Sequence, residues 1–456
     1  MCKEDRIHQN ISNVMKSSYI PELGRLYSGK VRDNHISGNR RVMITTDRIS
    51  AFDRILKKGI PFKGQVLNQL AEFWFEQTKD VVENHMIDVP DPNVMVVKEC
   101  KPISVEVVIR RYLSGSAWRS YLEKKEVSSV RLPDNLKEDQ ELPDLIITPT
   151  TKAVSVHDEE ISREEIIKNN IISENVYNKI EKISIELFKR GEEILKKRGL
   201  TLVDTKYEFG QLDGEIVLID EIHTPDSSRF WEKDKKYQDK EFVRKWLREH
   251  GFMGDGEQPV MPDDMIVEVS RRYISVYEKI TGKEFEFNPF PINERIIYNL
   301  KKKNYIKGCF VPVIIASDKD LEHARKIRKE LKSFGINSRL HISSAHKTPE
   351  HLLEIINIYE NSIEPIVYIT SAGMSDALSG MVSANTRFPV IACPPNFNTN
   401  DIFSSLRTPS YVPSMVVLNP ENAAMAAAKI FSLESVSEKM IEYKNKIKKL
   451  NKEFET

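Results

Sequence analysis

The sequence has few cysteines and no excess of either charge. It contains 4 cysteines in 456 residues, too few for a disulfide framework, and no two are spaced as CxxC for a zinc site. Its 68 Lys and Arg residues balance 68 Asp and Glu residues, so no net field attracts nucleic acid. We therefore expect reduced, mostly buried thiols and no nucleic-acid partner.

The sequence also lacks the signals of membrane insertion and export. No apolar run approaches the roughly 18 residues of a membrane-spanning helix. The first residues, MCKEDRIHQN, do not place a positive region before an apolar one. These absences predict a cytoplasmic protein without a membrane partner.

The length exceeds what one hydrophobic core usually supports, so we expect two domains. Up to about residue 220, short β-like runs such as VMITTD and EIVLIDEI mix with amphipathic helical segments, which predicts an α+β domain. From VPVIIAS at residue 311 onward, strands and helices alternate, which predicts a three-layer α/β domain with a parallel, flavodoxin-like or Rossmann-like sheet. We place the domains at residues 1–298 and 307–456.

Two carboxylates stand in apolar, strand-like runs of TKYEFGQLDGEIVLIDEIHTP, residues 205–225. Asp213-Gly214 is a turn signal, and a three-residue loop with Gly214 left-handed would pair Lys206 with Asp220. Lys206, Glu208 and Asp220 would then share one face, which suits a Mg²⁺ ion held between nucleotide phosphates. The alternative, which the pattern alone favours, is a solvated strand face with a Lys-Asp pair.

A glycine-containing segment, LGRLYSGKVRD, begins at Leu23. GRLYSGK fits GxxxxGK, but Val31 stands where a P-loop has Ser or Thr, and no apolar strand precedes Gly24. The segment is more typical of a β-turn that covers ATP than of a P-loop, with an ordinary loop as the alternative.

In the second half, SAHKTPE places His346 between a predicted strand and a helix that Thr348 would cap, with Pro349 in its first turn. Ligands bind at the carboxyl ends of parallel strands, and histidine can transfer a proton there. By position alone, a histidine that only packs or caps is the more frequent case. Ser317 to Asp320 likewise suits either an anion-binding turn or a helix cap.

Seven motifs in order resemble one family: YSGKVRD, TTDRISAFD, IPFKGQVLNQLAEFWF, PISVEVVIRRYLSGSAW, TPTTKAVSVHDEEIS, VDTKYEFG and DEIHTPDSSRFW. They are similar to the SAICAR synthetases (phosphoribosylaminoimidazole-succinocarboxamide synthases), over about residues 24–282. The resemblance implies an ATP-grasp or kinase-like fold. It also implies an ATP- and Mg²⁺-dependent ligase that activates the carboxylate of CAIR for attack by L-aspartate.

The resemblance also assigns roles to positions of this sequence. ATP would be bound by Gly29, Lys30, Arg32, Lys101, Ile103, Glu208 and Asp220, and the last two would also hold Mg²⁺. The substrate would be bound by Arg110, Ser116, Asp158 and Arg229, and Lys206 and Arg229 would take part in catalysis. Planar guanidinium groups suit phosphate or carboxylate binding.

Residues 311–432 resemble the AIR carboxylases, from IIASDKD and SAHKTP to SSLRTPS and PENAAMAAAKIF. The resemblance implies conversion of AIR to CAIR with His346 as the proton-transfer residue, and substrate contacts from Ser317, Asp320, Lys347 and Ser375. The loop SAGMSDALSG is similar to the form that uses CO₂ or bicarbonate directly. The family also implies a homo-oligomer, with the octamer as the form that such carboxylases adopt.

Three positions depart from the AIR carboxylase pattern: Ala316, Lys319 and Asp376. The leading hypothesis is a bifunctional enzyme of purine biosynthesis that makes SAICAR from AIR, a one-carbon source, L-aspartate and ATP. One alternative keeps the ligase and makes the second domain a non-catalytic module for oligomerisation or nucleotide sensing. Another is a P-loop or protein-kinase-like phosphotransferase, which would consume ATP without aspartate.

Overall fold

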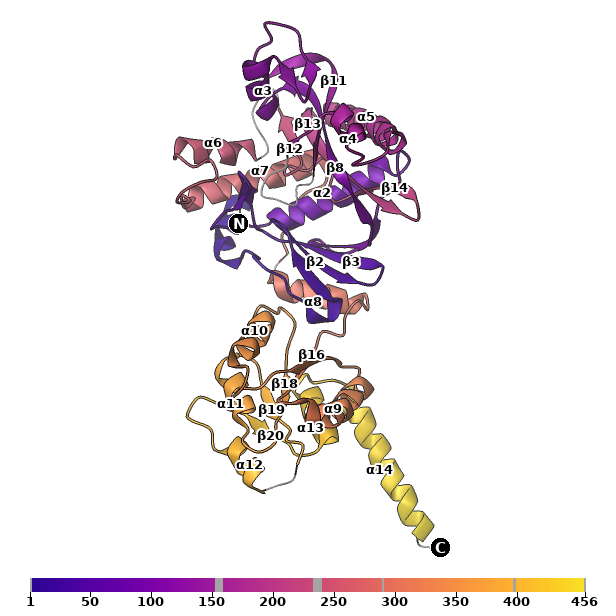
Figure 1. Ribbon diagram of the computed structural model, residues 1–456, viewed down its shortest axis with the longest axis vertical. Coiled ribbons are helices and arrows are strands. Elements are labelled where there is room, and N and C mark those ends of the chain that lie inside the picture. The colour runs from indigo at the N-terminus through magenta and orange to yellow at the C-terminus, as the bar shows by residue number, and fades with distance from the viewer. Residues whose placement is uncertain (1, 152–158, 233–239, 289–290, 397–398, 455–456) are drawn as a thin grey trace. The chain divides into compact units, whose positions relative to one another are not determined.

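The computed structural model describes residues 2–151, 159–232, 240–288, 291–396 and 399–454. The chain forms two compact units (Figure 1). The first comprises Met1–Ser17 and Arg25–Ile292, and the second comprises Ser18–Gly24 and Asn293–Thr456.

The first unit is built on two antiparallel sheets. One has the strand order β1-β2-β3-β7-β6, and the other has the order β12-β11-β8-β13-β14, with β15 also paired to β13. The strands, with the separate pairs β4–β5 and β9–β10, are β1 (Arg25–Ser28), β2 (Arg32–Ser37), β3 (Arg40–Thr45), β4 (Ser50–Ala51), β5 (Arg54–Ile55), β6 (Met86–Asp91), β7 (Val94–Lys98), β8 (Lys101–Leu113), β9 (Glu126–Val127), β10 (Val130–Arg131), β11 (Gln140–Thr151), β12 (Glu159–Glu160), β13 (Thr201–Leu212), β14 (Glu215–Ile219) and β15 (Ser228–Trp231).

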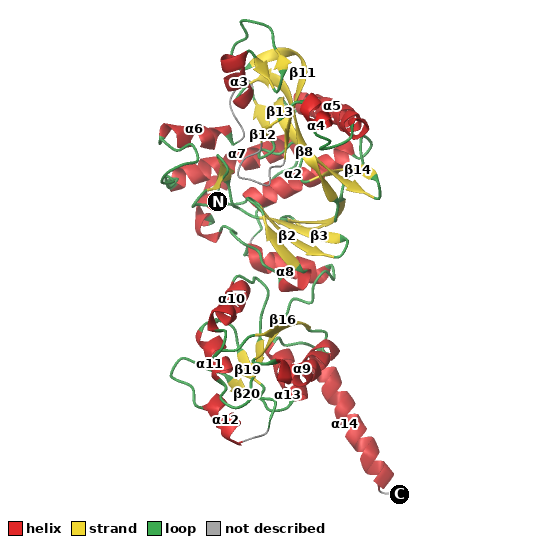
Figure 2. Ribbon diagram, in the orientation of Figure 1, coloured by secondary structure: helices red, strands yellow, loops and turns green. Residues whose placement is uncertain are grey.

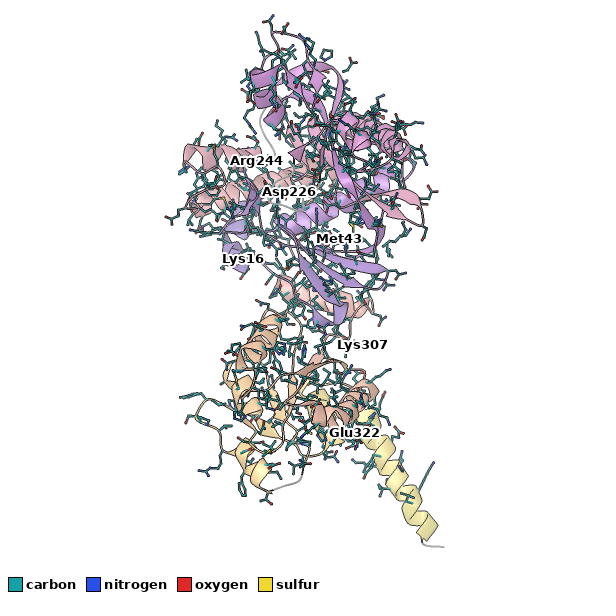
Figure 3. All side chains as sticks on the ribbon, viewed as in Figure 1. Lys16, Met43, Asp226, Arg244, Lys307 and Glu322 are labelled. Carbon is teal, nitrogen blue, oxygen red and sulfur yellow. The ribbon has the colours of Figure 1, made fainter. Side chains whose placement is uncertain are left out.

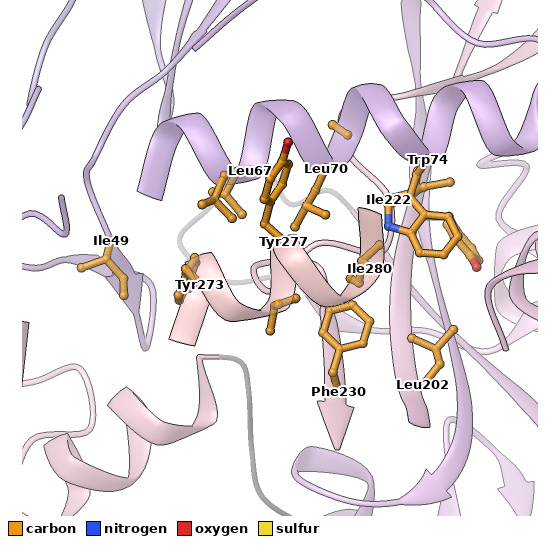
Figure 4. Close-up of a cluster of buried hydrophobic side chains, with 14 of the residues drawn as sticks. Ile49, Leu67, Leu70, Trp74, Leu202, Ile222, Phe230, Tyr273, Tyr277 and Ile280 are labelled. Carbon is orange, nitrogen blue, oxygen red and sulfur yellow. The ribbon is translucent and has the colours of Figure 1, made fainter. Parts of the chain in front are cut away.

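Amphipathic helices cover these sheets. They are α1 (Lys3–Gln9), α2 (Lys63–Thr78), α3 (Ser116–Lys124), α4 (Arg163–Lys168), α5 (Glu174–Lys197), α6 (Glu241–Glu249) and α7 (Asp263–Thr281). In α2, buried apolar residues recur every three or four positions, from Val66 to Phe75, so one face of the helix is apolar. That face packs against α7 (Figure 4). Helix α7 is followed by the C-cap residue Gly282, which has a left-handed φ of 72°.

The second unit contains a parallel sheet in the order β17-β16-β18-β19-β20, shown in yellow in Figure 2. Its strands are β16 (Phe310–Ile315), β17 (Asn337–Ile342), β18 (Tyr368–Ser371), β19 (Val390–Ala392) and β20 (Met415–Val416). Its helices are α8 (Ile292–Lys302), which starts at the unit boundary, α9 (Leu321–Ser333), α10 (Pro349–Glu360), α11 (Ala377–Ala384), α12 (Thr399–Leu406), α13 (Pro420–Ile430) and α14 (Ser435–Phe454).

Helices lie on both faces of this sheet. The core on one face joins strand side chains such as Val313 and Ile369 to α9 and α13. On the other face, Tyr359 of α10 contacts Phe310 and Tyr368 at ring-centroid distances of 5.9 and 6.0 Å. The strand order 2-1-3-4-5 is that of flavodoxin-like folds. The predicted α+β first domain and three-layer parallel second domain are therefore confirmed.

A short N-terminal segment, Ser18–Gly24, belongs to the second unit although its flanks belong to the first. Tyr19 forms a bridge with Ser362, and its carbonyl accepts a hydrogen bond from the amide of Ile363 at 3.0 Å. Ile20 is completely buried. No pattern in the sequence predicts that this segment belongs to the second unit.

Two smaller findings concern sequence expectations. Thr348 occupies the cap position of α10, but its hydroxyl does not cap the helix; it accepts a hydrogen bond from the Ser344 amide at 3.0 Å. The predicted capping by its side chain is therefore wrong. In the described residues, no helix combines the length and hydropathy needed to cross a bilayer.

Candidate functional site

A cavity of about 750 Å³ opens in the first unit between its two sheets. Its wall includes the β1–β2 loop from Gly29 to Arg32, the facing strands β8 and β13, and residues after β14. Figure 3 labels three of the lining residues, Met43, Asp226 and Arg244. Many of the lining side chains are charged, which suits a charged ligand.

The β13–β14 hairpin differs from the prediction by one residue. Glu208 pairs with Ile219, not with Leu218, because the loop contains only Asp213 and Gly214, with φ values of 52° and 89°. Two left-handed residues are typical of a two-residue type I′ turn. In the ordinary alternation of a strand, this register would separate Glu208 from Asp220.

Asp220 nevertheless lines the same cavity as Glu208. It follows the last residue of β14 and has a left-handed φ of 68°, which breaks the strand alternation at that point. Lys206, Glu208 and Asp220 therefore meet as expected, although the predicted register is wrong.

Strand β13 carries a polar stripe of Asp204, Lys206 and Glu208, while Tyr207 and Phe209 point into the core. Across the sheet, Asp204 pairs with Arg110, and Glu208 pairs with a second carboxylate, Glu106. Asp204 and Glu106 were not among the predicted site residues. Asp204 lies two residues before Lys206, and Glu106 lies four residues before Arg110, so strand alternation places each on the same face as a predicted residue.

Lys206 compensates for this pair of carboxylates. Its ammonium lies 3.1 Å from Glu106 and also pairs with Glu208. Burial opposes the charge on Lys206, but Glu208 and Glu106 raise its pKa above the ordinary value. The lysine therefore stays a cation at the cavity wall.

Arg32 bridges the carboxylates of Asp220 and Glu221, the second at 2.7 Å. Burial raises the pKa of Asp220 to about 6, although Arg32 acts in the opposite direction. An added cation in the cavity would stabilise the charged form of Asp220.

The β1–β2 loop is not a P-loop. Strand β2 follows directly after it, whereas a P-loop leads into a helix. Lys30 pairs with Asp53 at 2.5 Å and both residues are exposed. The segment is therefore a short loop between β1 and β2 beside the cavity, and its predicted role of covering ATP stays a prediction.

A second cluster gathers the predicted substrate arginines. Asp204 accepts hydrogen bonds from Arg110 at 3.0 Å and from Arg229 at 2.6 Å, and Ser116 lies 3.3 Å from Arg110. The guanidinium of Arg229 also packs against Gly115, where a Cβ atom would lie 2.1 Å from Nη2. Three of the four predicted substrate residues thus come together, and the fourth, Asp158, lies outside the described residues.

Two lysines surround Asp226 at the cavity wall, and neither was among the predicted site residues. The carboxylate of Asp226 lies 2.8 Å from both Lys63 and Lys240, and Tyr273 donates a hydrogen bond to it. Burial lowers the pKa of Lys63 to about 8, against the opposing effect of Asp226. Lys240 lines the cavity, as does Arg244 one turn later.

Around the start of β8, where Lys101 and Ile103 are expected to bind ATP, only alternate residues line the cavity. Cys100 and Pro102 line the cavity, whereas the side chains of Lys101 and Ile103 are not among the described residues that do. Lys101 is exposed and Ile103 is buried in the core. The alternation of β8 accounts for this difference.

In the second unit, the predicted residues follow the carboxyl ends of three neighbouring strands. Ser317 and Asp320 follow β16, His346 and Lys347 follow β17, and Ser375 follows β18. His346 and Ser375 are exposed. The strand order reverses at β16, and open α/β sheets bind ligands at such a point.

Asp376 has a structural task in this region. It caps α11 by accepting a hydrogen bond from the Ser379 amide at 3.0 Å, and it accepts another from the Ser405 hydroxyl at 2.7 Å. Asp376 therefore connects α11 to α12.

Asp320, which follows β16, has a raised pKa. Burial is the cause, and the charge of His323 opposes this effect.

Within the described residues, no group of three or more His, Cys, Asp or Glu side chains is arranged as a metal site. Glu208 and Asp220 nevertheless offer two carboxylates to one cavity. Mg²⁺ usually takes one or two carboxylates together with water and phosphate oxygens, so the residues present fit this ion beside a nucleotide.

Comparisons with known proteins agree with the two-unit organisation. A family model described as SAICAR synthetase matches residues 25–259, and one described as AIR carboxylase matches residues 310–450. The phosphoribosylaminoimidazole-succinocarboxamide synthase of Cytophaga hutchinsonii is 48% identical over 301 residues, which are 62% of this chain and 96% of that protein.

Two solved structures are similar to different parts of the chain. The SAICAR-synthase of Saccharomyces cerevisiae, complexed with SAICAR, is 32% identical with a TM-score of 0.55 and covers 60% of this chain and 100% of its own. Treponema denticola PurE is 42% identical with a TM-score of 0.32 and covers 32% of this chain and 99% of its own.

Proposed function

Because the chain belongs to the SAICAR synthetase family and carries an AIR carboxylase domain in the same polypeptide, we propose that it performs two consecutive steps of purine biosynthesis. Residues 307–456 carboxylate AIR to CAIR. Residues 1–298 join CAIR to L-aspartate with ATP and release SAICAR, ADP and phosphate. The single observation that supports the ligase step most strongly is the meeting of Lys206, Glu208 and Asp220 in one cavity.

We assign the nucleotide to the cavity, and the substrate to the arginine cluster around Asp204 of the neighbouring part of β13. In this proposal Gly29, Lys30 and Arg32 would hold ATP, Lys101 and Ile103 would offer their backbone to adenine, and Glu208 and Asp220 would hold Mg²⁺. The ion would neutralise charge that builds up when a phosphoryl group approaches a carboxylate. Lys206 places a further cation beside this position.

The arginine cluster binds the anionic substrate. Arg110, Ser116 and Arg229 would hold CAIR, with Asp204 fixing both guanidinium groups, and Asp158 remains part of the proposed site. Two planar donors held by one carboxylate suit a phosphate or carboxylate ligand. Arg229 would therefore orient the carboxylate that is activated.

In the second unit, carboxylation at the imidazole ring must also remove a proton. His346 would take that proton, and Ser317, Asp320, Lys347 and Ser375 would bind AIR at the same edge of the sheet. CO₂ or bicarbonate would supply the carboxyl group. We extend the proposal to a cytoplasmic homo-oligomer, with the octamer as the specific case to test.

One coupled experiment on the full chain tests both steps. Glu208→Gln and Asp220→Asn should each abolish SAICAR formation from CAIR, ATP and aspartate while CAIR formation from AIR continues. His346→Asn should have the opposite effect, and Glu215→Gln, at an exposed position of β14, is the matched control.

Three results would contradict the assignment. A normal ligase rate in both carboxylate variants would refute the Mg²⁺ site. Absence of CAIR formation by the unaltered chain would favour the alternative of a non-catalytic second unit. Consumption of ATP without aspartate would favour a phosphotransferase instead.

A further inference from the structure

Arg48 lies behind the β1–β2 loop and binds its backbone. Its guanidinium donates hydrogen bonds to the carbonyls of Gly29 at 2.9 Å and Lys30 at 3.2 Å. It also reaches the carbonyl of Lys16 at 2.6 Å and the carboxylate of Asp33 at 2.9 Å. The side chain is 11% exposed, so these acceptors replace water around the charge.

The other two carbonyls of the loop are also occupied. That of Val31 accepts from the Thr46 amide at 2.9 Å and the Thr46 hydroxyl at 2.7 Å. That of Arg32 accepts from the Gly29 amide at 2.7 Å. By contrast, the hydrogen bonds of the described chain include none donated by the amides of Lys30 and Val31.

Peptide geometry relates these two facts. In a planar trans peptide, the carbonyl of one residue and the amide of the next point in opposite directions. An arginine that binds the carbonyls of Gly29 and Lys30 therefore directs the amides of Lys30 and Val31 away from itself. Both residues line the cavity. Successive amides held in this way form an anion-binding concavity.

We propose that Arg48 is a positioning residue that holds the β1–β2 loop with the amides of Lys30 and Val31 directed at the phosphates of the nucleotide. Arg48 itself touches no ligand. The inference rests on the proposed binding of ATP in this cavity. In addition, phosphate recognition depends on the several donors of the Arg48 guanidinium, which bind the carbonyls of the loop. The single ammonium of a lysine cannot reproduce them.

The test measures nucleotide binding by calorimetry in the full chain carrying Arg48→Lys or Arg48→Met. Both variants should bind ADP and ATP about tenfold or more weakly than the unaltered chain, because two charge-assisted hydrogen bonds to the loop are lost. Adenosine, which has no phosphate, should bind both variants as it binds the unaltered chain. KM for ATP should rise while KM for CAIR stays constant.

Arg190→Met is the matched control, since Arg190 also joins a backbone carbonyl, that of Gln77, to a carboxylate, that of Asp80. It should leave every affinity unchanged. The role of Arg48 would be overturned if Arg48→Lys bound ADP with full affinity. It would also be overturned if the variants lost affinity for adenosine and ADP equally. Two other results would contradict the proposed nucleotide site instead. The unaltered chain would not bind ATP, or the Asp220→Asn variant would bind ATP as tightly as the unaltered chain does.

Discussion

Glu106 and Glu208 lie directly opposite each other on β8 and β13, and the ammonium of Lys206 pairs with both. Two like charges in this position are unfavourable, and both residues are more than nine-tenths buried. The arrangement is tolerable because the lysine lies between them. It also keeps two anions beside the proposed phosphate site, where a divalent ion would add to the compensation.

We predict that Lys206→Met destabilises the first unit as well as stopping the ligase. The change leaves two facing carboxylates without their cation, which should cost about 1–3 kcal/mol, discounted because a third of the lysine side chain is exposed. All 4 tryptophans lie in the first unit, so tryptophan fluorescence during urea unfolding measures its stability alone.

The double variant Lys206→Met with Glu106→Gln removes one of the two facing charges. It should recover part of the lost free energy of unfolding without recovering ligase activity. If the double variant is no more stable than Lys206→Met, repulsion between Glu106 and Glu208 is not the cause.

Gly115 gives a separate test of the arginine cluster. Its φ is 59°, and a Cβ atom there would lie 2.1 Å from the guanidinium of Arg229, which Asp204 holds in place. We predict that Gly115→Ala displaces Arg229 and raises KM for CAIR about tenfold, since a bond between charged groups is lost. KM for ATP should not change.

Gly214→Ala is the control for backbone strain. Gly214 has a φ of 89°, but no atom lies within 4 Å of an added Cβ. This variant should show only the strain of a left-handed residue, about 1 kcal/mol of unfolding free energy, with unchanged KM values. Equal kinetic effects of the two substitutions would contradict the steric argument.

The hairpin shows how far sequence patterns determine the site. Alternation placed Lys206 and Glu208 on one face and Tyr207 on the other, as found. The length of the turn was harder to predict, because Asp213 adopts a left-handed φ that glycine adopts more readily. One extra residue in the turn shifts every cross-strand pair of the hairpin. Asp220 reaches the cavity through its own left-handed backbone, which no local pattern indicates.

Other features depend on contacts between distant residues. The segment Ser18–Gly24 reads as an ordinary connection, yet Tyr19 bridges to Ser362 in the second unit. Arg48 belongs to a motif that was recognised, but its task depends on carbonyls of a loop 18 residues earlier. Sequence periodicity identifies faces and elements, whereas such pairings depend on packing that only the folded chain defines.

We predict that Ile20→Ala destabilises the second unit and not the first. Ile20 is fully buried, and removing a buried isoleucine typically costs about 2–5 kcal/mol. Calorimetry of the full chain should show a lowered transition for the second unit, while the tryptophan-monitored transition of the first stays in place. The reverse result would show that residues 18–24 are part of the first unit.

The same segment brings Glu22 to Glu364. The carboxylate of Glu22 accepts hydrogen bonds from the amides of Lys307 and Gly308, both at 2.7 Å, and its own amide lies 3.3 Å from Glu364. Glu364 is 1% exposed. Burial, followed by the hydrogen bond and charge of Glu22, raises the pKa of Glu364 well above its ordinary value. Glu364 therefore holds its proton to a higher pH in the folded chain than in the unfolded chain.

This proton makes the stability of the second unit depend on pH. The unfolded chain releases it near pH 4.3, about the ordinary pKa of glutamate, whereas the folded chain holds it to a higher pH. The stabilisation is thus complete below that value and decreases as pH rises toward the folded pKa.

Glu364→Gln cannot ionise, and its amide can still donate to Glu22. We expect the variant to match the unaltered chain at pH 4 and to be more stable at pH 8 in calorimetric unfolding of the second unit. A variant that is destabilised equally at both pH values would show that Glu364 acts through packing alone.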